Sequence, residues 1–146
     1  MEPIQGRGGI RIPPPDFLAE LGGMARHHGA LLVADEIFTG LGRTGTFLAS
    51  EPEGLRPDLV CLGKALGGGF PLSACSGPAS VMDAWPESEG EALHTSTFLG
   101  HPATCAAGLA FLGAFEEEDI PGRAEKLGKS LSNTLENEIS DAAAVV

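Results

Sequence analysis

The sequence is poor in basic residues and has no long apolar run. Only nine of its 146 residues are Lys or Arg, none of them in a run, against twenty Asp and Glu, so the net charge is −11. Nucleic-acid binding depends on clustered basic side chains, which argues against a nucleic-acid partner. No stretch is apolar for long enough to cross a bilayer, and the N-terminus lacks a signal-peptide pattern. We therefore expect no membrane partner and a cytoplasmic location.

Cysteine is also scarce. The chain has three cysteines, an odd number, and they are scattered along the sequence in apolar surroundings: Cys61, Cys75 and Cys105. This pattern is typical of buried free thiols in a reducing cytosol and not of a disulfide framework. With 42% hydrophobic and 20% charged residues, the chain has the composition of a soluble globular domain with a real core.

Apolar periodicity predicts helices alternating with short strands. A helix is expected over residues 17–28, with Asp16 as its N-cap and Gly29 at its C-terminal end. Further elements are predicted as strands at 30–34, 58–62 and 72–77, and as helices at 81–85, 102–118 and 124–139. The alternation indicates an α/β fold whose sheet is largely parallel.

Charged residues stand where the first two strands end. Asp35 and Glu36 follow the run Ala30–Ala34, and Lys64 follows the run Leu59–Leu62 in a glycine-rich setting. Ligands of open α/β sheets collect at the carboxyl ends of strands, and Glu2 would join them if the chain begins in a strand. A lysine kept available by apolar walls, opposite an acid, suits an aldehyde cofactor held as an imine with its ring nitrogen paired to the acid. Taken alone, each of these residues is better explained as a solvent-exposed charge. Their shared position at strand ends favours a cofactor-binding site.

Other motifs have weaker support. Residues 40–45 match G-x-G-x-x-G, but no adequate helix follows and the preceding acids would repel a pyrophosphate, so we expect a loop. Lys64 lacks the spacing of a Walker P-loop, and the four histidines lack metal-ligand spacing, so no metal is expected. Residues 95–97 precede a helix and could form a phosphate site; an ordinary capping cluster is about as probable locally.

Five ordered motifs resemble the class III aminotransferases, which are pyridoxal-phosphate (PLP) enzymes of fold type I. They are Glu-Pro-Ile-Gln-Gly at 2–6, Asp-Glu at 35–36, the glycine loop 40–45, Gly-Lys-Ala-Leu-Gly-Gly-Gly-Phe-Pro at 63–71, and Ser-Thr-Phe-Leu-Gly-His-Pro at 96–102. The resemblance covers almost the whole chain. It implies a PLP cofactor and transfer of an amino group between an amine or amino acid and a 2-oxo acid.

The resemblance also implies roles for single residues. Lys64 is similar to the catalytic lysine that forms an imine with the cofactor and moves a proton to and from the substrate. Asp35 is similar to the partner of the pyridine nitrogen, and Ile37 to the residue packing on the cofactor ring. Thr97 is similar to the threonine that reaches the cofactor phosphate of a neighbouring subunit, so a homodimer of the full-length protein is implied.

Two further positions follow from the same resemblance. Glu2 is similar to a substrate-gating glutamate of some members. Phe38 adjoins the cofactor where many members have a glutamine, so the polar contact of that glutamine is absent here. 

The chain lacks segments that the family has. An upstream phosphate loop, an upstream stacking aromatic and a downstream carboxylate-binding arginine are not found. We therefore expect a segment of a longer protein, with residues 1–118 part of the PLP-binding large domain and residues 119–146 a helix leading toward a missing C-terminal small domain. A related PLP enzyme, such as an aminomutase or racemase, and a non-catalytic remnant of the fold are the alternatives.

Overall fold

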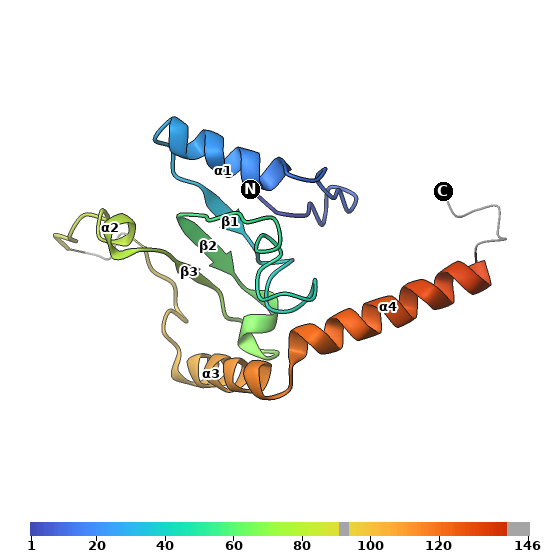
Figure 1. Ribbon diagram of the computed structural model, residues 1–146. Coiled ribbons are helices and arrows are strands. Elements are labelled where there is room, and N and C mark those ends of the chain that lie inside the picture. Colours follow the sequence, from blue (N-terminus) through green and yellow to red (C-terminus); the bar gives the residue numbers. More distant parts are fainter. Residues whose placement is uncertain (91–93, 140–146) are drawn as a thin grey trace.

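The computed structural model describes residues 1–90 and 94–139. The elements run along the chain in this order: α1 Phe17–His27, β1 Val33–Asp35, β2 Leu59–Leu62, the 3₁₀ turn η1 Lys64–Gly67, β3 Ala74–Ser76, α2 Ala79–Met82, α3 Pro102–Glu117 and α4 Ile120–Ile139 (Figure 1). Every expected helix and strand is present, with shifted ends, and the α/β fold class is confirmed.

The sheet is mixed, in the order β1-β2-β3. β1 and β2 are parallel and pair Asp35 with Cys61, whereas β2 and β3 are antiparallel and pair Cys61 with Cys75. The antiparallel pairing has a simple cause, because a parallel return needs a crossover of roughly a dozen residues or more, usually a helix. The connection over residues 63–73 contains only the short turn η1. The sheet is therefore less parallel than the sequence pattern indicated.

β1 starts later than expected and has an additional neighbour. The backbone N–H of Leu32 donates to Asp58 Oδ2 at 2.7 Å, so a side chain replaces a ladder partner at that point. On the other edge of β1, the Met1 amino group donates to Val33 O at 2.7 Å and Asp35 N donates to Met1 O at 2.7 Å. These two bonds place Met1 beside β1 in the manner of a parallel strand.

Helices lie on both sides of the sheet. Figure 1 shows α1 above the strands and α3 below them. Leu18 of α1 and Ala34 of β1 belong to the buried core. On the other side, α3 packs against η1, and a Cβ added at Gly108 would lie 2.6 Å from Leu72 Cδ2. The small residues of α3 thus allow close contact with the segment that carries Lys64.

Asp16 does not cap α1 as predicted. Its φ of 68° is left-handed and its side chain makes no cap hydrogen bond. An N-cap residue normally has extended backbone angles that aim its side chain at the first free N–H groups, so Asp16 occupies the predicted N-cap position without forming the cap hydrogen bond. Gly29 does end the helix with φ +64°, and its N–H donates to Arg26 O at 3.2 Å.

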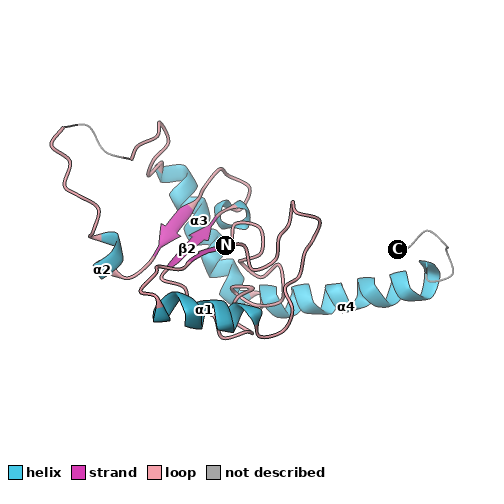
Figure 2. Cartoon of the chain, turned by 90° about the horizontal axis from the view of Figure 1, so that it is seen from above, coloured by secondary structure: helices cyan, strands magenta, loops and turns pink. Residues whose placement is uncertain are grey.

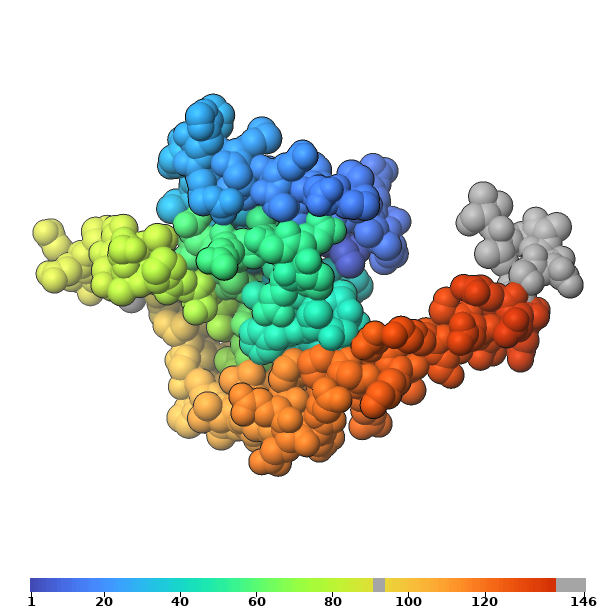
Figure 3. Space-filling model, in the orientation of Figure 1, coloured from blue at the N-terminus to red at the C-terminus, as the bar shows by residue number. Residues whose placement is uncertain are grey.

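α4 extends away from the sheet in both ribbon views (Figure 1 and Figure 2). The space-filling view shows it projecting from the body of the molecule (Figure 3). Its leucines Leu127, Leu131 and Leu135 remain 61%, 60% and 46% exposed. Among the described residues, no helix is both long enough and apolar enough to cross a membrane.

Candidate active site

Asp35 and Lys64 lie at the same edge of the sheet. Asp35 is the last residue of β1, and Lys64 comes two residues after the end of the parallel strand β2. Asp35 pairs with Cys61, so the lysine follows only three residues beyond the partner of the acid. The parallel pairing therefore brings to one end of the sheet two residues that are far apart in sequence.

The backbone at Lys64 has an uncommon conformation. Its φ is +47°, although it is not glycine, and it begins η1 directly after the extended Gly63. Left-handed backbone at a non-glycine residue costs free energy and is concentrated at functional positions. The Lys64 side chain is exposed, and its Nζ lies 5.3 Å from the centroid of the Phe38 ring. The sequence led us to expect apolar side chains around this lysine. The structure shows one aromatic ring, that of Phe38, at cation–π distance from the ammonium.

Phe38 links the lysine to the N-terminal segment. A Cβ added at Gly6 would lie 2.6 Å from a ring carbon of Phe38, so the ring packs directly on the Gly6 backbone. The N–H of Gly6 donates to Glu2 Oε2 at 3.0 Å. Glu2, Phe38 and Lys64 are thus parts of one neighbourhood, built from three separate segments of the chain.

A hydrogen bond between residues two positions apart links Asp35 and Ile37. The N–H of Ile37 donates to Asp35 Oδ1 at 3.1 Å, while Oδ2 takes no hydrogen bond from the part of the chain that is described. Ile37 Cγ2 lies 3.3 Å from the position of a Cβ added at Gly63, which places its side chain against the residue before the lysine. The carboxylate is half-buried and keeps one oxygen available for a ligand.

Glu36 has a role that the sequence reading missed. Its side chain is 1% exposed. It accepts hydrogen bonds from Thr39 Oγ1 at 2.5 Å, Ser50 Oγ at 2.7 Å, Ser50 N at 3.0 Å and Ala49 N at 3.1 Å. Successive residues of an extended chain point to opposite sides, which separates Glu36 from Asp35. Glu36 anchors the loop that follows β1, and the only sequence signal for this was a carboxylate beside hydroxyl-bearing loop residues.

The G-x-G-x-x-G segment forms a loop, as predicted. Residues 39–54 consist of turns and bends, with Gly42 at φ +87° and Gly45 at φ +91°. The N–H of Gly40 donates to the backbone oxygen of Glu36 at 2.8 Å. A dinucleotide motif would open a helix here, and none follows.

No hydrogen bond joins Thr97 to Lys64 in the part of the chain that is described. Thr97 lies exposed in the turn over residues 97–100 before α3, and its side chain makes no hydrogen bond among the described residues. The described residues also bring no three His, Cys, Asp or Glu side chains together in a way that could hold a metal ion.

The cysteines differ from the expectation of buried thiols. All three are free, but only Cys61 is half-buried, and Cys75 and Cys105 are exposed. Cys75 lies on β3, whose outer edge has no strand beside it in the described chain, and Cys105 lies on an open face of α3. The prediction of burial is therefore wrong for two of the three.

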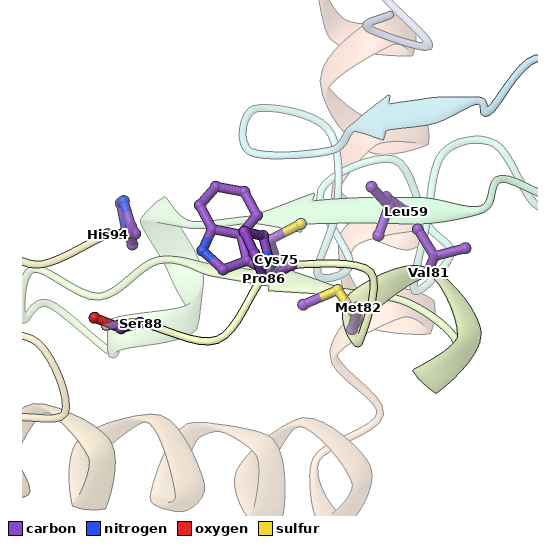
Figure 4. Close-up of a pocket in the computed structure, with 8 residues that line it drawn as sticks. Leu59, Cys75, Val81, Met82, Pro86, Ser88 and His94 are labelled. Atoms are coloured by element: carbon purple, nitrogen blue, oxygen red, sulfur yellow. The ribbon is translucent and has the colours of Figure 1, made fainter. Parts of the chain in front are cut away.

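An apolar pocket of about 690 Å³ lies elsewhere in the molecule. It is lined by Leu59, Cys75, Val81, Met82, Trp85, Pro86, Ser88 and His94. Figure 4 shows Cys75, Met82 and Pro86 gathered at its centre. It includes neither Asp35 nor Lys64, so it is separate from the candidate site.

Known proteins of one family match this sequence and this fold. The family model for "Aminotransferase class-III" matches residues 1–146. Acetylornithine aminotransferase of Mycolicibacterium smegmatis is 45% identical over 136 residues, which are 93% of this chain and 34% of that protein. The solved structure of ornithine aminotransferase from Plasmodium yoelii superposes with a TM-score of 0.88 at 35% identity and covers 98% of this chain and 37% of that one.

A third match is an amine transaminase from an uncultivated Pseudomonas species, solved in a PLP-bound form. It has a TM-score of 0.82 at 40% identity, and it covers 95% of this chain and 32% of that one. This chain therefore spans about a third of the length of the relatives that it matches. The fold is that of the fold type I PLP-dependent aminotransferases, and by sequence and structure alike the chain belongs to the class III aminotransferase family.

Proposed function

We propose that this chain supplies the reactive lysine and its partner acid to a PLP-dependent aminotransferase. The whole protein would move an amino group between an amine or amino acid and a 2-oxo acid. The observation that carries the proposal is the placement of Asp35 and Lys64 at one sheet edge by the parallel pairing of β1 with β2. The family membership and the similarity to a PLP-bound transaminase support it.

The residues present fit this cofactor. PLP, when bound, supplies an aldehyde for the lysine and a ring that accepts electrons from the substrate. An exposed primary amine, a carboxylate with one oxygen unbonded, and the apolar side chains of Ile37 and Phe38 lie around one edge. These are the donor, acceptor and packing surfaces that an aldehyde on a flat, protonated pyridine ring requires.

Each residue then has a distinct task. Lys64 Nζ would hold the cofactor through its aldehyde and would carry the proton to and from the α-carbon of the substrate. Asp35 would hold the ring nitrogen of the cofactor and, by its negative charge, would keep that nitrogen protonated. Ile37 and Phe38 would pack on the ring and exclude water from it, and Glu2, which is hydrogen-bonded to the Gly6 backbone that Phe38 contacts, would influence substrate entry.

Thr97 would act across a dimer. Its side chain is exposed and makes no hydrogen bond among the described residues of its own chain, so its hydroxyl is available for a contact with the cofactor phosphate of a neighbouring subunit. We accordingly propose that the full-length protein is a cytoplasmic homodimer. In it, residues 1–118 would form part of the cofactor-binding large domain, and residues 119–146, with the projecting α4, would lead toward a C-terminal small domain.

Cofactor capture by this chain can be tested on its lysines. The chain has three, Lys64, Lys126 and Lys129, and the last two lie on α4. The chain is mixed with PLP, the absorbance of the lysine adduct is recorded, borohydride reduces the adduct, and peptide mapping locates it. We expect more of the reduced PLP adduct on Lys64 than on Lys126. The adduct at Lys64 should be absent in the Lys64→Arg variant and unchanged in the Lys126→Arg variant. Equal label on all three lysines would contradict the proposal.

Turnover separates the remaining alternatives. Dependence on an added 2-oxo acid acceptor in the full-length protein supports an aminotransferase, whereas activity without an acceptor would indicate an aminomutase or racemase. A lack of any absorbance change with PLP would indicate a non-catalytic remnant. For the isolated chain we expect weak PLP binding and little or no turnover, because the upstream phosphate loop that the family uses to anchor the cofactor phosphate is not found in this sequence.

A further inference from the structure

Cys61 and Cys75 face each other across the antiparallel pair of β2 and β3. They are direct register partners. Side chains of directly opposed residues in an antiparallel pair lie on the same face of the sheet. Two cysteines that lie fourteen positions apart in sequence are therefore neighbours in space.

The backbone hydrogen bonds show which kind of pair this is. Leu59 N donates to Leu32 O at 3.1 Å, and Glu36 N donates to Cys61 O at 3.0 Å. Along a strand, alternate residues direct their N–H and C=O to the same side, so Leu59 and Cys61 both turn these groups toward β1. Cys61 and Cys75 consequently form a non-hydrogen-bonded pair, the type in which Cα atoms come closest, at about 4.5 Å. A disulfide requires Cα atoms roughly 4.4–6.8 Å apart.

The two thiols also differ in access. Cys75 is exposed and Cys61 is half-buried. Burial raises the pKa of the Cys61 thiol, and the adjacent Cys75, by its charge and a thiol hydrogen bond, raises that pKa further. The exposed thiol is therefore the one that a solute reaches first, with the second thiol next to it.

We propose that Cys61 and Cys75 are a redox-active dithiol that a low-molecular-weight disulfide converts into an intramolecular disulfide. The Cys75 thiolate attacks one sulfur of the small disulfide, forms a mixed disulfide and releases one small thiolate. The Cys61 sulfur then attacks the Cys75 sulfur, closes the protein disulfide and releases the second small thiolate. The protein loses two protons and two electrons, and the small disulfide gains both as two thiols.

The position of the pair gives the reaction a second consequence. Asp35, Cys61 and Cys75 occupy one row across the three strands. The modification would thus occur one strand away from the carboxylate of the candidate site. Cys105, on α3, has no such partner and serves as the internal control.

The test uses the reduced 146-residue chain in mixtures of reduced and oxidised glutathione. Free thiols are trapped with acid and N-ethylmaleimide, and the unreduced protein is digested. Trypsin separates Cys61 from Cys75 by cutting after Lys64, and a glutamate-specific protease separates Cys75 from Cys105 by cutting at Glu87 or Glu89. Linked peptides are then identified by mass.

We expect the Cys61–Cys75 link to form in the folded chain at an oxidised-to-reduced ratio about tenfold or more lower than in urea, because folding raises the effective concentration of the thiols. Cys105→Ser should leave this link unchanged, and Cys61→Ser should leave a glutathione adduct on Cys75. The wild-type measurement does not depend on either variant folding. The proposal is overturned by separate glutathione adducts without the link, by links to Cys105 in equal amount, or by equal oxidation in urea.

Discussion

The loop after β1 and the helix α4 both carry carboxylates, but their surroundings are opposite. Glu36 is buried and receives four hydrogen bonds from three loop residues. Glu125 on α4 is exposed and pairs with Lys129 one turn later, at 2.6 Å. A buried carboxylate with several donors fixes the chain around it, whereas an exposed ion pair contributes little because water and salt screen it. The difference indicates that the structural order of the candidate site comes from the loop and not from the helix.

The largest expected effect comes from removing the buried carboxylate. Glu36→Ala leaves the donors of Thr39 and Ser50 without their acceptor, so we expect a loss of about 2–4 kcal/mol in the free energy of unfolding. Urea denaturation measures it. Glu51→Ala, at an exposed position of the same loop, is the matched control and should change stability by less than about 0.5 kcal/mol. Equal effects of the two variants would contradict the anchoring role of Glu36.

An intermediate effect is expected on α3, which has a packed face and an open one. A Cβ at Gly108 would meet Leu72 Cδ2 at 2.6 Å and Leu66 O at 3.3 Å, whereas one at Gly113 meets nothing within 4 Å. Both Gly→Ala changes improve helix propensity equally. Gly108→Ala should therefore be less stable than Gly113→Ala by about 1–3 kcal/mol because of overpacking.

Thermal or urea unfolding of the two variants compares them directly. The Gly108→Ala variant should also show altered reactivity of Lys64, because α3 packs on η1 at this point. If the two variants are equally stable, the contact between α3 and the lysine turn is not tight.

The smallest effect belongs to the exposed pair on α4. The hydrogen bond from Lys129, followed by its charge, lowers the pKa of Glu125. Since a lowered carboxyl pKa stabilises the fold above the unfolded pKa, this contribution is lost as the pH falls through the folded pKa. Lys129→Ala should raise the Glu125 pKa toward its ordinary value, as followed by NMR titration, with hardly any change in the unfolding midpoint. A large change in that midpoint would mean that α4 is held more firmly than its exposure suggests.

Much of the local structure was predictable. The apolar spacing over residues 17–28 and the Pro at position 102 gave α1 and α3 nearly correct bounds. The motif at Lys64 and the acid at Asp35 were assigned to strand ends, and both are there. Helical periodicity, strand runs and glycine-rich turns depend on neighbouring residues, so a sequence displays them directly.

Other features depended on contacts between distant segments. The sequence showed Glu36 only as a charged residue after a strand, whereas hydrogen bonds from Ser50 make it a buried acceptor. Asp16 stands at the N-cap position that the sequence indicated, but its backbone is left-handed and its side chain makes no cap hydrogen bond. For Glu36 the deciding partner is distant in sequence, and a local pattern cannot reveal such a partner.

By itself, the sequence indicated the candidate site residues Asp35 and Lys64 and the strand ends at which they lie, because hydrophobic period and motif spacing are properties of the chain. Only the tertiary structure decided that β3 runs antiparallel to β2, and with it that Cys75 faces Cys61. It also decided that the ring of Phe38 lies close to both the Gly6 backbone and the Lys64 ammonium. The physical reason is that strand direction and side-chain contact are settled by how separate segments pack, and each packing choice depends on surfaces that no single segment contains.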